Sequence, residues 1–177
     1  MLTTQIARPG ADEYGAYYGK YIDPMSETDA LEAIRNQIAG TTRLLGAVPE
    51  ARASHRYAPG KWSIKQVVCH MSDVERVMSY RALRVGRGDA TPLPGFDENI
   101  YAESCGADAR TLADLVDEFR AVRAATIALF ASFDEAALTR RGTASENPVT
   151  PRAIAWIIAG HERHHVGLFR ERYGLTG

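Results

Sequence analysis

The sequence predicts an all-α protein, a four-helix bundle, on three observations. Four segments of about 20 residues repeat apolar side chains at the helical spacing of three and four residues. Each of them lies between residue types that begin and end helices, and no segment shows a convincing strand pattern. Four amphipathic helices of similar length bury their apolar faces by packing together as a bundle.

The first two helices follow from their caps and apolar stripes. The first is expected to begin at Ser26, whose hydroxyl can cap it, with Asp29 in the first turn, and Pro49 ends it. The second begins at Ser63–Gln66, a capping box in which the glutamine side chain reaches back to the serine amide. Its apolar positions continue until Gly86.

The last two helices are bounded in the same way. The third runs from a cap at Thr111 to about Phe130, and a further short turn is expected near 134–138. The fourth begins at Thr150, followed by proline at the first helical position, and continues to about Tyr173.

Two segments lie outside a minimal bundle of this kind. The loop 89–101, between the second and third helices, is long and rich in proline, and such loops in compact domains are often functional. Residues 1–25 hold four of the eight tyrosines and are expected to pack along the bundle. Residues 1–177 are therefore expected to form a single domain, which is a usual size for one.

Composition narrows the class of function. The chain has 21 Lys and Arg against 22 Asp and Glu, so no excess of basic charge favours nucleic-acid binding. The polar start Met1–Gln5 gives no signal-peptide pattern, and no apolar run is long enough to span a membrane. Two cysteines make no disulfide framework. We therefore expect a cytoplasmic protein that binds neither nucleic acid nor membrane.

Histidines interrupt the apolar stripes at two places. In the fourth helix His161 and His165 are four residues apart, so both imidazoles lie on the face shared by Ile154 and Ile158. His70 lies on the inward stripe of the second helix, together with Val67 and other valines. Imidazole is a common ligand of zinc, nickel and iron. The pattern predicts one divalent transition metal, with an open position for water or substrate.

A structural role for these histidines is the competing interpretation. A single inward histidine such as His70 is more often a hydrogen-bonded core residue than a ligand. The pair His161 and His165 is harder to explain in that way, because each buried ring needs polar partners. Of the remaining histidines, His55 is expected on the surface. His164 is offset from the stripe, so it either supports a ligand or lies on the surface.

The same residues also match another motif. His161-Glu-Arg-His-His165 has the H-E-x-x-H spacing of zinc proteases, in which the glutamate is the general base. The third ligand of such sites lies downstream, but no histidine follows His165. We reject the protease interpretation and keep Glu162 as a candidate base for a metal-bound water.

Several neighbours of the histidines are candidates for supporting or substrate-binding roles. Trp62 can form a wall of the site, although packing is the simpler role. Arg81, three turns after His70, can meet an anionic substrate, although an ion pair with an acidic residue is the more ordinary expectation. Asp73 and Glu75 can accept the free ring N–H of a ligand histidine or lie on the solvated surface. Cys69 points about 100° away from His70 and is not expected to be a ligand.

These motifs together resemble one family. The second helix of the DinB/YfiT-like family is similar to the run Gly60–His70 with Asp73–Arg76 after it. The family's interhelical loop resembles Leu93–Asp97, and its last helix resembles Trp156 through His165. The tyrosines near the N-terminus are similar to its first segment. The resemblance spans nearly the whole chain and is most specific around Lys61–His70 and in the last helix.

The resemblance implies a fold, a site and a class of chemistry. It implies a four-helix bundle, usually a homodimer, with a metal held by His70, His161 and His165. Family members of known activity are mostly transferases or isomerases that use a low-molecular-weight thiol such as bacillithiol, mycothiol or glutathione. The leading hypothesis is therefore a metal-dependent transferase that joins such a thiol to a small electrophile. A hydrolase using a metal-bound water and a non-catalytic stress protein are the alternatives.

Overall fold

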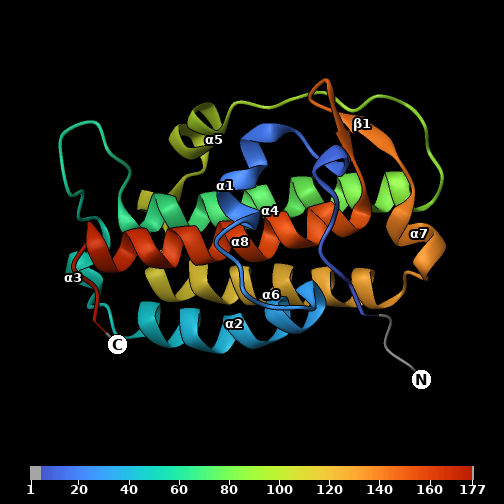
Figure 1. The fold of residues 1–177 in the computed structure, drawn as a ribbon. Helices are drawn as coiled ribbons and strands as arrows, with labels where there is room; N and C mark the ends of the chain where they lie inside the picture. Colours follow the sequence, from blue (N-terminus) through green and yellow to red (C-terminus); the bar gives the residue numbers. More distant parts are fainter. Residues whose placement is uncertain (1–4, 177) are drawn as a thin grey trace.

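Four long helices form the bundle in the computed structural model, which describes residues 5–176. They are α2 (Ala30–Gly46), α4 (Ile64–Gly86), α6 (Leu112–Ala131) and α8 (Pro151–Glu171) (Figure 1). Helix α4 packs against α6 and α8, and α2 packs against the same two helices, so α2 and α4 lie on a diagonal. The predicted all-α four-helix bundle is confirmed.

The helix directions explain the long connection between the second and third bundle helices. Helices α4 and α6 are neighbours that run in the same direction, opposite to α2 and α8 (Figure 1). The chain must therefore return along the whole bundle between them. The return connection, residues 87–111, carries α5 (Glu98–Ser104) and the 3-10 turn η3 (Ala107–Ala109). The predicted loop 89–101 is present, although its last residues are helical.

The helix starts follow the predicted caps with one correction. Asp29, not Ser26, caps the first bundle helix, because its carboxylate accepts hydrogen bonds from the backbone N–H groups of Leu31 and Ile6. That helix begins at Ala30, later than expected. The other three caps are as predicted, and the side chains that accept the capping bonds belong to Ser63, Thr111 and Thr150.

The expectation that the chain has no strands was wrong in one place. A short antiparallel hairpin joins β1 (Gly142–Ala144) and β2 (Asn147–Val149). The residues at its turn, Ser145 and Glu146, have φ values of 50° and 63°, a conformation that usually calls for Asn-Gly. The sequence therefore lacks the turn residues that would have predicted this hairpin. Leu93 bonds to this hairpin through its backbone, which fixes the middle of the return connection.

The N-terminal segment packs along the bundle, and residues 1–4 of the expected segment 1–25 lie outside the described range. It contains η1 (Ala11–Glu13), η2 (Ala16–Tyr18) and α1 (Gly19–Ile22), and α1 packs on α8 (Figure 1). The indole of Trp156 donates to the carbonyl oxygens of Ile6 and Ala7. The remaining short helices are α3 (Glu50–Ala53) and α7 (Glu135–Thr139), the latter at the predicted turn near 134–138.

A layer of polar side chains divides the hydrophobic core into two clusters. On α8, residues 154–159 belong to one cluster and Phe169 to the other. His161, Glu162 and His165 lie between them in the sequence and are buried. The same change of cluster occurs on α2, α4 and α6, so the polar layer crosses the middle of the bundle.

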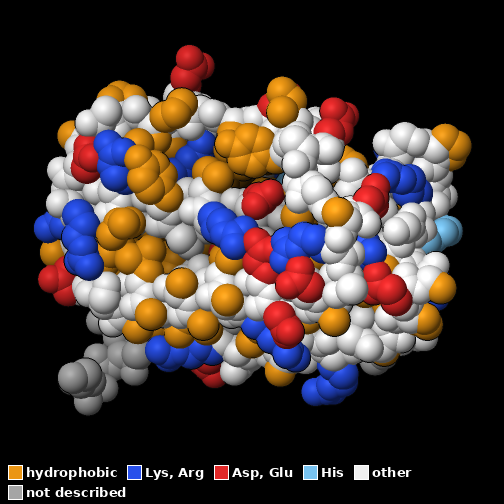
Figure 2. All heavy atoms as spheres, turned by 180° about the vertical axis from the view of Figure 1, so that it is seen from behind, with side chains coloured by type: hydrophobic (Ala, Val, Ile, Leu, Met, Phe, Trp, Pro, Cys, Tyr) orange, Lys and Arg blue, Asp and Glu red, His pale blue; other side chains and the backbone are white. Residues whose placement is uncertain are grey.

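The surface mixes both signs of charge. Figure 2 shows the back of the molecule, where Lys and Arg are interspersed with Asp and Glu and hydrophobic side chains gather toward the upper left. No helix within residues 5–176 is long and apolar enough to cross a membrane.

Candidate metal centre

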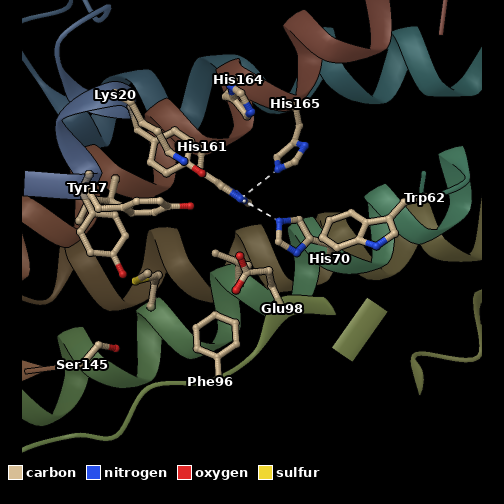
Figure 3. Close-up of a pocket in the computed structure, with 15 residues that line it drawn as sticks. Tyr17, Lys20, Trp62, His70, Phe96, Glu98, Ser145, His161, His164 and His165 are labelled. Carbon is tan, nitrogen blue, oxygen red and sulfur yellow. Dashed lines mark hydrogen bonds between the residues drawn. The ribbon is translucent and has the colours of Figure 1, made fainter. Parts of the chain in front are cut away.

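Three imidazoles meet in the polar layer. His161 and His165 stand one turn apart on α8, and His70 reaches them from the antiparallel neighbour α4 (Figure 3). Nε2 of His161 lies 3.1 Å from Nε2 of His70 and 3.0 Å from Nε2 of His165. The ligand atoms of all three residues lie within 4.8 Å of one another. The structure thus brings together the three histidines that the sequence singled out.

The spacing of these nitrogens fits a transition-metal ion. Two nitrogens that are each about 2.1 Å from one ion lie about 3.0 Å apart when the N–metal–N angle is near 90°. The two Nε2–Nε2 distances at His161, 3.1 and 3.0 Å, match this separation. The third separation, between His70 and His165, is within 4.8 Å, and three protein ligands leave at least one position on an ion open.

The electrostatic surroundings keep the imidazoles neutral, as metal ligands must be. Burial lowers the pKa of His70 to about 4, with a smaller contribution from the nearby His164. Burial also lowers the pKa of His161 and of His165 well below the usual range, and the neighbouring histidines add to the effect. Nδ1 of His165 is buried with no hydrogen-bond partner among the described residues. Each ring can therefore offer a lone pair at neutral pH.

The histidines form one side of an open pocket of about 290 Å³. Aromatic side chains supply much of its wall, and Trp62 lies against the His70 ring with the ring centres 4.7 Å apart. The Tyr21 ring meets His161 edge-on at 5.4 Å, and burial raises the pKa of Tyr21. The other aromatic residues of the wall are Tyr17, Tyr18 and Phe96. A small molecule beside the histidines would therefore contact several aromatic rings.

Three further polar residues of the pocket were not singled out from the sequence. Lys20 lies in the short helix α1, with its ammonium 3.7 Å from the centre of the Tyr17 ring. Glu98 opens α5, and its carboxylate points into the pocket (Figure 3). Ser145 comes from the turn of the β-hairpin. All three lie in short elements without long periodic patterns. The proline-rich loop for Glu98 and the tyrosine-rich segment for Lys20 are the only sequence features that could have drawn attention to these two residues, and Ser145, in the hairpin turn, has no such signal.

Glu162 does not face the histidine cluster, which is a correction to its candidacy as a general base. Its carboxylate accepts hydrogen bonds from the Arg123 guanidinium, at 2.5 Å, and from the Thr41 hydroxyl. Burial raises the pKa of Glu162, whereas Arg123 and Thr41 act in the opposite direction. Glu75 binds the same guanidinium and is buried, so the expectation of a surface position for it was wrong.

Arg81 is buried, and it has no carboxylate partner within residues 5–176. Its guanidinium donates to the carbonyl oxygen of Pro94 at 2.8 Å and to the hydroxyl of Ser145 at 2.9 Å. The expected ion pair is therefore wrong. Arg81 instead ties the return connection to the hairpin, which together carry Phe96 and Ser145 of the pocket wall.

The remaining candidates separate into pocket and non-pocket residues. Trp62 and the exposed His164 line the pocket, and His55 is exposed as expected. Asp73 contacts Arg76 at 3.4 Å and makes no bond to the three histidines. Cys69 is directed to the carbonyl oxygen of Cys105, and burial raises the pKa of its thiol to about 12. It is not part of the histidine cluster.

Comparison with known proteins agrees with this fold. Residues 33–169 match the DinB superfamily, which covers all four bundle helices apart from their outermost residues. The chain belongs to the DinB superfamily. No curated protein sequence matches it.

Two solved structures share the architecture. YfiT from Bacillus subtilis, a probable metal-dependent hydrolase with an unusual four-helix bundle topology, aligns with a TM-score of 0.72 and 15% identity over 96% of this chain and 95% of its own. A mycothiol-dependent maleylpyruvate isomerase aligns with a TM-score of 0.66 and 15% identity over 78% of this chain and 58% of its own. At this identity the likeness establishes the fold.

Proposed function

We propose that this protein is a metal-dependent enzyme that transfers a low-molecular-weight thiol to a small electrophile. One observation carries the proposal: three neutral, buried imidazoles converge within a pocket that is open to a small molecule. His70, His161 and His165 would hold one divalent ion of zinc, nickel or iron. Three ligands are typical of catalytic sites, because they leave room for substrate.

The bound metal would supply Lewis acidity that favours the thiolate form of a thiol, and the thiolate is the reactive nucleophile. The chain's own side chains would do the rest. Glu98 can accept the thiol proton as the new sulfur–carbon bond forms, and can return it to the product atom that gains the electron pair. Trp62 and Phe96 can contact the electrophile and exclude water.

Hydrolysis is the second candidate, and the position of Glu98 favours it as well. A carboxylate that points into the pocket can take a proton from water, the task that Glu162 cannot perform from its buried ion pair. The structural neighbour YfiT is a probable metal-dependent hydrolase, whereas the other neighbour depends on mycothiol. Both candidates use the same three histidines.

The two candidates differ in whether a thiol is consumed. Purified protein loaded with zinc, nickel or iron is incubated with bacillithiol, mycothiol or glutathione and a maleimide or halo-aromatic compound. Loss of free thiol above the uncatalysed rate supports transfer, and turnover of esters or amides without thiol supports hydrolysis. Inactivity in both assays with metal retained would favour a non-catalytic stress protein and refute the proposal.

Glu98→Gln tests the assignment of the proton acceptor. The exposed Glu103 lies on the same short helix outside the pocket, so Glu103→Gln is the matched control. Loss of a general base commonly lowers turnover by about 10²–10⁴-fold. We expect such a loss of kcat for the first variant, with metal content unchanged, and wild-type kcat for the second. Equal kcat values in the two variants would remove Glu98 from the mechanism.

The assembly and location of the protein are part of the proposal. We propose a homodimer in the cytoplasm, as the family resemblance implies, where both cysteines stay reduced; neither forms a disulfide in the structure. The exposed apolar side chains of Tyr80 and Leu83 on α4, and of Ile100 and Tyr101 on α5, offer surface for such contact. Sedimentation of the purified protein distinguishes dimer from monomer.

A further inference from the structure

A buried ion-pair network lies directly behind the histidine cluster. The Arg123 guanidinium on α6 donates two hydrogen bonds of 2.8 Å to Glu75 on α4 and one of 2.5 Å to Glu162 on α8. It also donates to the carbonyl oxygen of Ile34 on α2 at 3.0 Å. All four bundle helices meet at this one side chain. Arg123, Glu75 and Glu162 are only 1%, 3% and 2% exposed.

The charges of the network do not balance. Two carboxylates share one guanidinium, so with both carboxylates ionised the network carries one negative charge in excess, and burial, which raises the pKa of Glu162, opposes that charge. A buried charge without a counter-charge is costly, and packing alone gives no reason to keep it. Glu162 directly follows His161 in the sequence, so a cation held by the three histidines would be a close counter-charge for it.

A small cavity connects the network to the histidine cluster. It has a volume of about 10 Å³, and His161, Glu75 and Glu162 are its polar lining residues. A space of this size with several polar neighbours suits one water molecule. Because Nε2 of His161 is turned toward the other two histidines, Nδ1 is the ring nitrogen left to bond on this side.

We propose that Glu162 is a positioning residue for the metal centre, acting through His161. One water in the small cavity accepts the Nδ1–H of His161 and donates to the carboxylates of Glu162 and Glu75. This bond fixes the tautomer in which the Nε2 lone pair is free for the metal. The excess negative charge of the network stabilises the cation. This inference rests on the proposed three-histidine site, and it assigns Glu162 a role other than the general base.

The test measures the zinc dissociation constant by competition with a chelator, together with thermal unfolding of the metal-free protein. Glu162→Gln keeps the shape of the side chain and removes the charge; its amide oxygen can still accept from Arg123, and its NH2 group can donate to the Thr41 hydroxyl in place of the bond that the carboxylate accepts. Glu13→Gln is the matched control, because Glu13 is a buried glutamate that also accepts from a threonine and an arginine, Thr150 and Arg152, near the start of α8.

We expect Glu162→Gln to weaken zinc binding by about 10–100-fold, the usual effect of losing a group that orients a ligand histidine. Glu13→Gln should lower the unfolding temperature without changing zinc affinity. If Glu162→Gln does not fold, Glu75→Gln removes the same charge from the network and should weaken zinc binding similarly. A dissociation constant equal to that of the wild type in the folded variants overturns the inference.

The tautomer of His161 tests the same inference without any substitution. Nitrogen-15 chemical shifts of the metal-free wild-type protein should show the proton of His161 on Nδ1. A proton on Nε2 would overturn the inference. Failure of the wild-type protein to bind zinc, nickel or iron at all is a different result, because it overturns the proposed site and with it any role for Glu162.

Discussion

Replacing His161 with alanine removes the nitrogen that lies 3.1 Å from Nε2 of His70 and 3.0 Å from Nε2 of His165. Both close contacts of the cluster pass through this residue, so the two remaining imidazoles lose their common neighbour. Binding of zinc by four ligands in small proteins releases about 10–16 kcal/mol, or roughly 3–4 kcal/mol for each ligand. The variant should therefore bind metal about 10²–10³-fold more weakly, since each 1.4 kcal/mol is tenfold.

The assay is metal content after dialysis against a weak chelator, followed by a titration of the dissociation constant. His164→Ala is the control, because His164 lies on the same helix beside the cluster but is exposed and contributes no ligand atom to it. The control should retain the wild-type metal content. Wild-type affinity in the His161 variant would refute the assignment of the cluster as a metal site, whatever the activity of the protein.

Three other predictions concern the surroundings of the site. In the metal-free protein, the lowered pKa of His70 makes the free energy of unfolding depend on pH: the contribution of His70 is complete above the unfolded-state pKa of 6.5 and is lost, by roughly 3 kcal/mol, as pH falls toward about 4. Denaturation at several pH values should show a smaller loss of unfolding free energy in His70→Gln than in the wild type. An equal loss in both proteins would contradict the lowered pKa. Gly160→Ala would place a Cβ 2.2 Å from the backbone oxygen of Tyr21, so it should lower the free energy of unfolding by about 1–3 kcal/mol. The control Gly167→Ala, on the same helix but facing open space, should raise the free energy of unfolding. Arg81→Met removes the two hydrogen bonds that the guanidinium donates to the Pro94 carbonyl and the Ser145 hydroxyl, which should cost about 1–3 kcal/mol and increase hydrogen exchange in the return connection. Unchanged exchange there would show that the arginine does not hold this segment.

The bundle could be predicted because the residues that form each long helix lie within that helix's own segment of the sequence. Each long helix carries its own apolar period and its own cap, and Ser63, Thr111 and Thr150 act as the sequence indicated. The hairpin could not be predicted, because its two strands are three residues long and its turn uses Ser145 and Glu146 instead of glycine or asparagine. A period of two cannot be recognised over so few residues.

The site was predictable where its residues lie on the long helices or, like Trp62, directly before one. His161 and His165 share a face through the helical repeat alone, and His70 lies on an inward stripe of a second helix. Lys20 and Glu98 come from short elements that fold over the bundle, and their distance from the histidines depends on how the long connections return. That information is not present in any local pattern.

The helix geometry also explains why His161 and Glu162, adjacent in a protease-like motif, have opposite surroundings. Successive residues of a helix point about 100° apart, so a side chain that faces the pocket places the next one elsewhere. In α8 the next direction leads into the centre of the bundle, where Arg123 from α6 and Thr41 from α2 bind the carboxylate. A glutamate fixed there cannot reach a substrate in the pocket. It can act on the metal centre only from behind, by fixing the imidazole that precedes it and by adding negative charge. The motif is thus shared with proteases, whereas the division of its two residues between the pocket and the core belongs to this bundle.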